Sequence, residues 1–192
     1  MKTFLTAIFL MFAFTTNAQN ILEWDSTYQL QFTDFQNPTT KIGGGNMFSL
    51  YSGASFDFAY SMNTIEFAFS KNFNSKVNCT FNRDAASMVA PDKEMAEALL
   101  AFARYDFDLA ELYARKFRKK LFEEKDVLSE GNFYQSIYND IKKEHVERHT
   151  TAGQLTNLGM TKEKLQELHQ QIRDEIQQLA DYCKTCKPIK KK

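Results

Sequence analysis

Four residues of the sequence have types and spacings that suit metal binding. His145 and His149 are four residues apart, so on a helix they share one face and could bind one metal ion together. Glu147 lies between them, and Asp106 could approach from an earlier helix. Such a site would indicate a metal-dependent hydrolase. Lysine, glutamate and arginine side chains surround both histidines, however, and a stretch of this composition is typical of a solvated helix surface.

The cysteines and the remaining histidine offer little further chemistry. Cys183 and Cys186 could form a disulfide in an oxidising compartment, but no second cysteine pair accompanies them to build a zinc site. Cys79 lies in a strand-like run, where we expect it to be buried and therefore a poor nucleophile. His169 lies beside an apolar helical stripe and is expected to have a structural role. The sequence contains no Gly-x-Ser-x-Gly motif, the pattern that would indicate a serine hydrolase.

The segment that carries Asp106 is predicted to be a long amphipathic helix. It begins after Pro91, with Asp92 as the N-cap, and runs to about Glu123. Asp106 falls in the middle of the apolar side, where a carboxylate needs a partner such as a tyrosine or a histidine. It is the one polar residue that this side is expected to hold. The opposite, polar side carries Arg104, Asp108, Glu111, Arg115, Arg118 and Lys119.

The order of the sequence patterns predicts the fold class α+β. Between about residues 28 and 82, alternation of apolar and polar residues predicts an antiparallel sheet with strands near 28–35, 56–62, 65–69 and 77–81. After Pro91 the period becomes helical and predicts about three helices, ending near residue 123, spanning about 131–149, and following a cap at Thr161. Strands followed by helices indicate one α+β domain over residues 19–192, with the long helix packed on the sheet and a short basic C-terminal tail.

Four short segments follow one another in an order that resembles a known family. They are Phe32–Gln36, Ala86–Val89, Phe107–Arg115 and Thr150–Gly153. They are similar to elements of exported bacterial proteins, mainly classed as a domain of unknown function, that carry a zinc-peptidase His-Glu-x-x-His motif. In that family, the third segment follows the second metal-binding histidine, and the fourth contains a Thr-x-His-Gly sequence before a helix. The resemblance implies a zincin-like fold.

The same resemblance implies that the metal chemistry has been lost. The first metal-binding histidine corresponds to Phe102, the general-base glutamate to Ala103, the second histidine to Asp106 and the third to Ala152. Catalytic zinc needs three protein ligands and an open position, and only one of these residues has an oxygen to offer. The resemblance therefore implies a catalytically inactive pseudo-metallopeptidase without a cofactor.

The N-terminus has the pattern of a cleavable signal peptide. Lys2 precedes an apolar run of about eleven residues from Phe4 to Phe14, and small residues then lead to a cleavage site after Ala18. The run is too short to cross a bilayer, which takes about 20 apolar residues. We therefore expect a periplasmic or secreted protein with no stable membrane span after cleavage.

The composition narrows the classes of partner. The chain has 24 basic and 24 acidic residues, and this balance argues against nucleic acid. Because the resemblance implies an inactive site, it also implies a binding or structural module, whose partner would be an unknown protein or envelope ligand. It would use the former substrate cleft, or assemble through a sheet edge or the C-terminal helix. The alternative is a metal-dependent hydrolase with a rearranged site at Asp106, His145 and His149.

Overall fold

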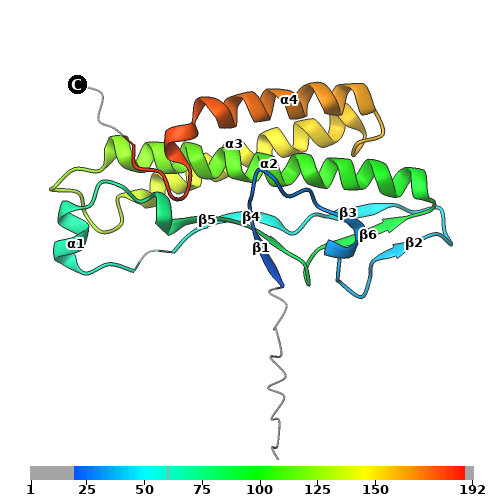
Figure 1. Cartoon of the computed structure of the whole chain (residues 1–192), viewed down its shortest axis with the longest axis horizontal. Coiled ribbons are helices and arrows are strands. Elements are labelled where there is room, and N and C mark those ends of the chain that lie inside the picture. The colour runs from blue at the N-terminus through cyan, green and yellow to red at the C-terminus, as the bar shows by residue number, and fades with distance from the viewer. Residues whose placement is uncertain (1–19, 60, 189–192) are drawn as a thin grey trace, which may run out of the picture.

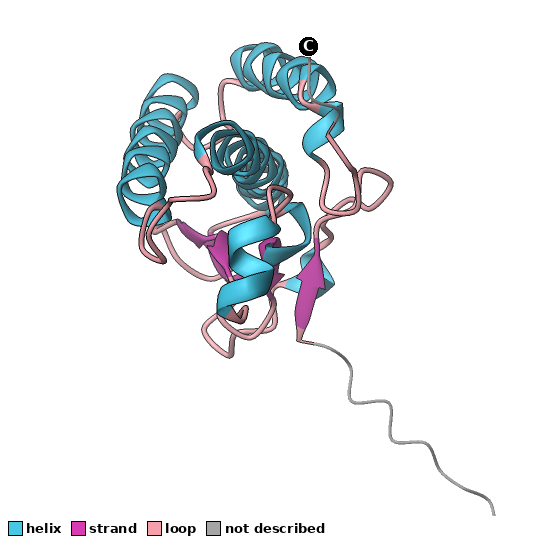
Figure 2. Cartoon of the chain, turned by 90° about the vertical axis from the view of Figure 1, so that its left-hand side faces the viewer, coloured by secondary structure: helices cyan, strands magenta, loops and turns pink. Residues whose placement is uncertain are grey.

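The computed structural model describes residues 20–59 and 61–188. The N-terminal half forms a layer of strands, and the helices of the C-terminal half lie on one side of that layer (Figures 1 and 2). The predicted α+β class is therefore confirmed, as is the packing of the long helix on an N-terminal sheet. The predicted signal peptide, residue Tyr60 and the tail residues Lys190 to Lys192 lie outside the described residues.

The strands form two short sheets, each with a strand from the 77–90 region at its centre. One sheet has the order β1-β5-β4 and is antiparallel, whereas the other has the order β2-β6-β3 and contains a parallel pair, β2 with β6. The predicted antiparallel pairing holds between β4 and β5, whereas the parallel pair joins two segments that the sequence did not indicate as strands. The bounds are β1 (Ile21–Glu23), β2 (Lys41–Ile42), β3 (Ser49–Tyr51), β4 (Ala54–Phe58), β5 (Val77–Asn82) and β6 (Ser87–Ala90).

The two sheets are joined through a bend between β3 and β4. Tyr51 pairs with Ser87 at the end of one sheet, and three residues later Ala54 pairs with Phe81 in the other. Gly53 allows the bend, because its φ is +70° and a Cβ there would lie 2.6 Å from the carbonyl oxygen of Asn82. Residues 49–58 consequently form one bent edge along both sheets. Among the described strands, β3 and β4 each pair on one side only.

Helix α2 (Lys93–Glu124) is the central element of the helical layer. Asp92 caps it, its Oδ1 accepting a hydrogen bond from the backbone N–H of Met95 at 2.8 Å, as predicted. α2 packs on β4 and β5 and also contacts both other long helices, α3 (Tyr134–Thr156) and α4 (Lys162–Gln178). The core therefore lies between α2 and the strands. Its fully buried aromatic residues are Phe56, Phe73, Phe81, Phe102, Tyr105 and Phe117.

Two segments predicted as strands have other structures. Residues 28–35 form an irregular segment that ends in the 3-10 helix η1 (Phe32–Asp34), and 65–69 belong to the short helix α1 (Thr64–Phe69). The side chain of Asn63 caps α1 by accepting from the N–H of Glu66 at 2.8 Å. Alternating aromatic residues indicate a strand only where one face is buried. In α1, Ile65 and Phe69 are exposed.

The second long helix extends further than predicted. α3 continues to Thr156, and its C-cap Asn157 adopts a left-handed conformation with φ of 46°. The segment Thr150–Gly153, expected to lie before a helix, is therefore inside α3. α4 begins after Thr161, as predicted, although the Thr161 side chain makes no capping hydrogen bond. The 3-10 helices η2 (Asn74–Lys76) and η3 (Ala180–Tyr182) complete the described elements.

Asp106 is buried on the apolar side of α2, as predicted, but part of the opposite, polar side is buried too. Glu111, Arg115 and Arg118 are buried as well. The Oε1 atom of Glu111 accepts hydrogen bonds from Arg115 Nε at 2.8 Å and from Arg118 Nη1 at 3.0 Å. We call these three residues the buried charge cluster. Helical periodicity places them on the polar side of α2, but it does not show which part of the chain covers that side.

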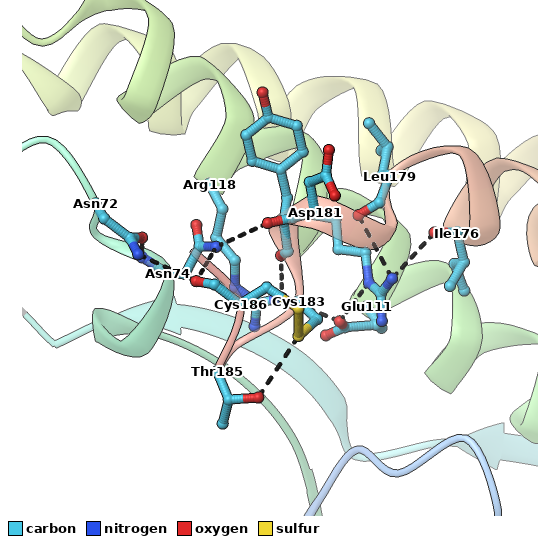
Figure 3. Close-up of a disulfide and its surroundings, with 12 residues drawn as sticks. Asn72, Asn74, Glu111, Arg118, Ile176, Leu179, Asp181, Cys183, Thr185 and Cys186 are labelled. Carbon is cyan, nitrogen blue, oxygen red and sulfur yellow. Dashed lines mark hydrogen bonds and ion pairs between the residues drawn. A yellow bond between two sulfur atoms is a disulfide. The ribbon is translucent and has the colours of Figure 1, made fainter. Parts of the chain in front are cut away.

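The C-terminal segment covers the buried charge cluster (Figure 3). Arg115 donates to the carbonyl oxygen of Ile176 at 3.0 Å, and Arg118 donates to that of Tyr182 at 3.2 Å. Directly after η3, a disulfide joins Cys183 to Cys186, the pairing that the sequence left open. The two arginines of α2 thus hold the C-terminal segment by donating hydrogen bonds to the backbone carbonyls of that segment. These bonds also satisfy charges that burial would otherwise leave without partners.

Candidate functional site

The carboxylate of Asp106 is the centre of the candidate site. It lies on α2 and is almost fully buried. His149 of α3 donates a hydrogen bond from Nδ1 to Asp106 Oδ1, with a separation of 2.6 Å. Ser52, from the bend between β3 and β4, donates from its hydroxyl to the other oxygen, Oδ2. The prediction that this carboxylate needs a partner such as a histidine is confirmed.

The hydrogen bond to Asp106 defines the chemical state of His149. Because Nδ1 carries the shared proton, Nε2 is the nitrogen left for another partner, and it has none among the described residues. The hydrogen bond from the ring to Asp106 raises the pKa of His149 above its ordinary value of 6.5. The side chain of His149 remains 40% exposed. An oriented imidazole with an accessible Nε2 can donate to, or accept from, a bound group.

His145 lies one helical turn before His149, and its pKa is shifted in the opposite direction. Burial lowers the pKa of His145 to about 4, so the ring is neutral at physiological pH. Its ring packs edge-on against Phe56 and Tyr113. Its Nε2 atom is buried and has no hydrogen-bond partner in the described part of the chain. The expectation of a solvated surface around the two histidines is therefore wrong for His145.

These side chains line a common pocket, here called the Asp106 pocket, between the bent edge and α3. Its volume is about 230 Å³. The edge contributes backbone and side chains on one side, α3 contributes the other side, and Phe102 and Asp106 of α2 form part of the lining between them. The lining residues are Leu50, Tyr51, Ser52, Gly53, Ala54, Phe102, Asp106, His145, Val146, His149 and Leu158.

Of the four positions that the resemblance would assign to a zinc-peptidase motif, two line the Asp106 pocket and two do not. Phe102 and Asp106 line the Asp106 pocket, and Phe102 packs edge-on against His149. Ala103 and Ala152 are buried without contributing to its lining. Phe102 stacks on Tyr105, and burial raises the pKa of the Tyr105 hydroxyl to about 12. The aromatic ring of Phe102 thus occupies space where a metal-binding histidine is expected from the resemblance.

The metal-binding alternative is only partly matched by the geometry. Asp106, His145 and His149 do line one pocket, whereas Glu147 is exposed and does not contribute to it. Within residues 20–59 and 61–188, no group of three or more His, Cys, Asp or Glu side chains is arranged to hold a metal ion. Both carboxylate oxygens of Asp106 already accept hydrogen bonds, from Ser52 and His149. The zinc site of the resembling family therefore does not fit the residues of this chain.

Ser52 is the residue of this site that the sequence did not reveal. It belongs to a short Ser-Gly sequence between two strands, and nothing in its spacing indicates an interaction with a carboxylate 54 positions away. The one local hint in the sequence is the glycine at position 53, whose positive φ in the structure forms the bend that brings Ser52 to α2. A glycine between two apolar strands is too common to identify a site residue.

A second carboxylate–histidine pair lies two residues further along α2. Asp108 accepts hydrogen bonds from His169 Nε2 at 2.6 Å and from Trp24 Nε1 at 2.8 Å. Burial opposes ionisation of Asp108, but these hydrogen bonds outweigh it and lower its pKa. His169 therefore links α4 to α2, which agrees with its expected structural role.

Comparisons with known proteins give the chain no relatives: no family model matches it, and no curated protein or solved structure matches it significantly. The resemblance to exported zinc-peptidase-like proteins therefore stays a prediction. As for membranes, none of the helices in the described ranges is both long and apolar enough to cross one.

Proposed function

We propose that this protein is an exported binding module that holds an extended peptide segment along its bent edge, without hydrolysing it. The observation that carries the proposal is the position of the Asp106 pocket. It lies directly between an edge that has no further strand among the described residues and the exposed face of α3. The proposal keeps the predicted role of a catalytically inactive peptidase-like protein and gives its ligand a chemical class.

The edge supports a peptide ligand because of its backbone. β3 and β4 are paired on one side only among the described strands. On β4, the N–H of Ala54 donates to the Ser52 hydroxyl at 3.4 Å and the C=O of Phe56 accepts from Tyr138 at 3.5 Å. Both contacts are long, so an additional strand could replace them and pair with the backbone groups of this edge. An extended peptide satisfies such groups by strand addition, which supplies affinity with little sequence preference. Sequence preference would then come from side chains of the peptide that enter the neighbouring pocket.

The pocket suits one side chain of such a peptide. Its volume of about 230 Å³ is smaller than the 300–1,000 Å³ typical of sites for whole small molecules. Val146 and Tyr51 border it and are largely exposed, so an apolar side chain would bury surface against them. His149 offers one polar contact through Nε2. The preferred peptide should therefore carry an apolar residue, with a hydrogen-bonding group near its end or in the adjacent backbone.

Selection of peptides from a random display library by the mature protein tests the proposal. Val146→Glu should abolish binding of the selected peptides, because it places a charge at the pocket. Leu155→Glu is the matched control, since Leu155 is also on α3 and similarly exposed (52% against 57%) but does not line the pocket. Methylating alternate backbone nitrogens of a selected peptide should also weaken binding at least about tenfold, because strand addition needs its N–H groups. Selected peptides that bind Val146→Glu as tightly as the wild type, or a library that yields none, would refute the proposal.

The metal-dependent hydrolase is the second candidate, and one observation favours it. His145 Nε2 has no hydrogen-bond partner among the described residues, and it belongs to the same pocket as His149. Zinc titration of the mature protein by calorimetry separates the two candidates. Stoichiometric binding that both His145→Ala and His149→Ala remove would favour the hydrolase. Our first proposal expects no saturable binding of zinc.

A further inference from the structure

A second concave site lies where the N-terminal segment meets α2 and α4. We call it the Trp24 groove; its volume is about 480 Å³, within the range of sites for small molecules. Residues 24–30 form one wall, and α2 and α4 form the others. It shares no lining residue with the Asp106 pocket. The residues that line it are Trp24, Ser26, Tyr28, Gln29, Leu30, Ala101, Arg104, Phe107, Asp108, Leu165, Gln166, His169, Arg173, Ile176 and Gln177.

Two guanidinium groups give this groove donors that the protein does not use. Arg104 donates from Nε to the carbonyl oxygen of Leu30 at 2.8 Å, which fixes the side chain against the N-terminal segment. Its two terminal nitrogens have no acceptor among the described residues. Arg173 lies with Nε 3.6 Å from Asp108 and is about half exposed. A planar guanidinium with free terminal nitrogens is suited to bind a carboxylate or a phosphate.

The one carboxylate in the groove is already neutralised. Asp108 accepts from Trp24 and His169 and forms its ion pair with Arg173. These donors compensate its charge and hold the ring of Trp24 in place. The two guanidinium groups and the one carboxylate leave one positive charge in excess, that of Arg104, and this charge favours an anion.

The remaining lining combines apolar and aromatic residues with four polar ones, Ser26, Gln29, Gln166 and Gln177. Leu165, Ile176 and Phe107 line the groove but are themselves buried. The rings of Trp24 and Tyr28, on the wall formed by the N-terminal segment, are partly exposed. A free inorganic anion would leave these side chains in water. An anion attached to an apolar body would cover them and gain the free energy of their burial.

We propose that the Trp24 groove binds a small organic acid, whose carboxylate pairs with Arg104 and whose apolar body lies against the rings of Trp24 and Tyr28. The proposal is independent of the peptide-binding function, because the two sites have no residue in common. It assigns to α4 and the N-terminal segment a role beyond covering the core.

Fluorescence gives a direct test, because Trp24 is the only tryptophan of the chain. We would titrate the mature protein with 4-phenylbutyrate, with the neutral 4-phenylbutanol, and with inorganic phosphate. The proposal expects a saturable change with 4-phenylbutyrate, with a dissociation constant below about 1 mM. The alcohol and phosphate should each bind at least tenfold more weakly, since each lacks one half of the recognised chemistry.

Variants locate the binding. Arg104→Gln should weaken 4-phenylbutyrate binding at least tenfold, whereas Lys119→Gln, which removes a positive charge from α2 outside the groove, should change it less than twofold. If Arg104→Gln does not fold, Arg173→Gln tests the same charge from α4. Val146→Glu should retain binding in full, so failure at one site is distinguished from failure at the other. Equal affinity for acid and alcohol, an unaffected Arg104→Gln and Arg173→Gln, or no saturable signal would each overturn the proposal.

Discussion

Asp106 shows how a single buried carboxylate connects three parts of the chain. Its oxygens accept hydrogen bonds from Ser52 of the bent edge and from His149 of α3, while its own backbone belongs to α2. Burial makes these bonds consequential, because a donor that loses its acceptor in the interior is poorly rehydrated. The residue therefore supports the pocket and also contributes to the stability of the fold.

Asp106→Asn should lower both the pKa of His149 and the stability of the protein. The amide cannot offer the negative charge whose hydrogen bond raises that pKa, and one of its two polar atoms is a donor facing another donor. We expect a loss of about 1–3 kcal/mol in the free energy of unfolding. NMR titration of the His149 ring and urea unfolding measure the two effects. Asp57→Asn, at an exposed carboxylate on β4, is the control, and an unchanged His149 pKa would contradict the assignment.

The two histidines should give opposite dependences of stability on pH. His145 has its pKa lowered from 6.5 to about 4, so between these values the unfolded state binds more protons and stability falls as the pH decreases. The whole effect is on the order of 3 kcal/mol. His145→Phe keeps the ring contacts with Phe56 and Tyr113 and should remove this loss. Urea unfolding from pH 4 to 9 measures it, and an unchanged slope below pH 6.5 would refute the prediction.

His149 provides the comparison for that experiment. Its folded pKa is raised, so its contribution is fully present below the unfolded value of 6.5 and is lost as the pH rises through the folded value. His149→Phe should therefore change the pH dependence of stability above pH 6.5. The loss of stability below pH 6.5, which comes from His145, should remain. If both variants changed the stability on the same side of pH 6.5, the assignment of opposite pKa shifts to the two rings would be wrong.

At the scale of elements, one glycine allows the connection between α3 and α4 to lie directly against α2. Gly159 has a φ of +99°, and a Cβ at this position would collide with the backbone carbonyl of Ala98 in α2. Both features exclude larger residues, since the strain cannot be relieved by rotating a side chain. The connection between the two helices therefore depends on a residue that the sequence analysis did not single out.

Gly159→Ala should be strongly destabilising, by about 2–4 kcal/mol, because it combines backbone strain with a steric clash. Gly45→Ala is the matched control: Gly45 lies in the loop between β2 and β3, and a Cβ there meets nothing within 4 Å. The control should stay within about 0.5 kcal/mol of the wild type. Thermal and urea unfolding of both variants provide the comparison. Equal stability of the two variants would show that the α3–α4 connection tolerates a larger residue.

Across the whole molecule, the buried charge cluster joins α2 to a central strand and to the C-terminal segment. Arg118 donates to the carbonyl oxygen of Val77 in β5 at 2.8 Å and to that of Tyr182 after α4. Glu111 is the carboxylate that both arginines of the cluster contact. Removing its charge would leave two guanidinium groups buried with no counter-ion.

Glu111→Gln should therefore cost about 3–5 kcal/mol, the range seen when one partner of a buried ion pair is removed. Glu124→Gln is the control, because the Glu124–Lys120 pair on the same helix is about half exposed and should contribute less than about 1 kcal/mol. Urea unfolding gives both values. A loss for Glu111→Gln as small as that of the control would mean that the cluster is hydrated.

The sequence by itself determined the class of the fold and the course of its central helix. Asp92 as the cap, the helical period after it and the alternation at Val77, Cys79 and Phe81 are local signals, and α2 and β5 agree with them. It also identified Asp106 as a buried carboxylate in need of a partner. These features depend on neighbours within a few positions, which periodicity and capping residues record directly.

Only the tertiary structure decided which residues Asp106 contacts and which charges of α2 are buried. Ser52 and His149 lie 54 and 43 positions away, and no local pattern encodes contacts over such separations. Likewise, Glu111, Arg115 and Arg118 have the spacing of an exposed helix face, and they are buried because the C-terminal segment folds over them. Burial is a property of what packs against a surface, so it is determined when distant parts of the chain meet.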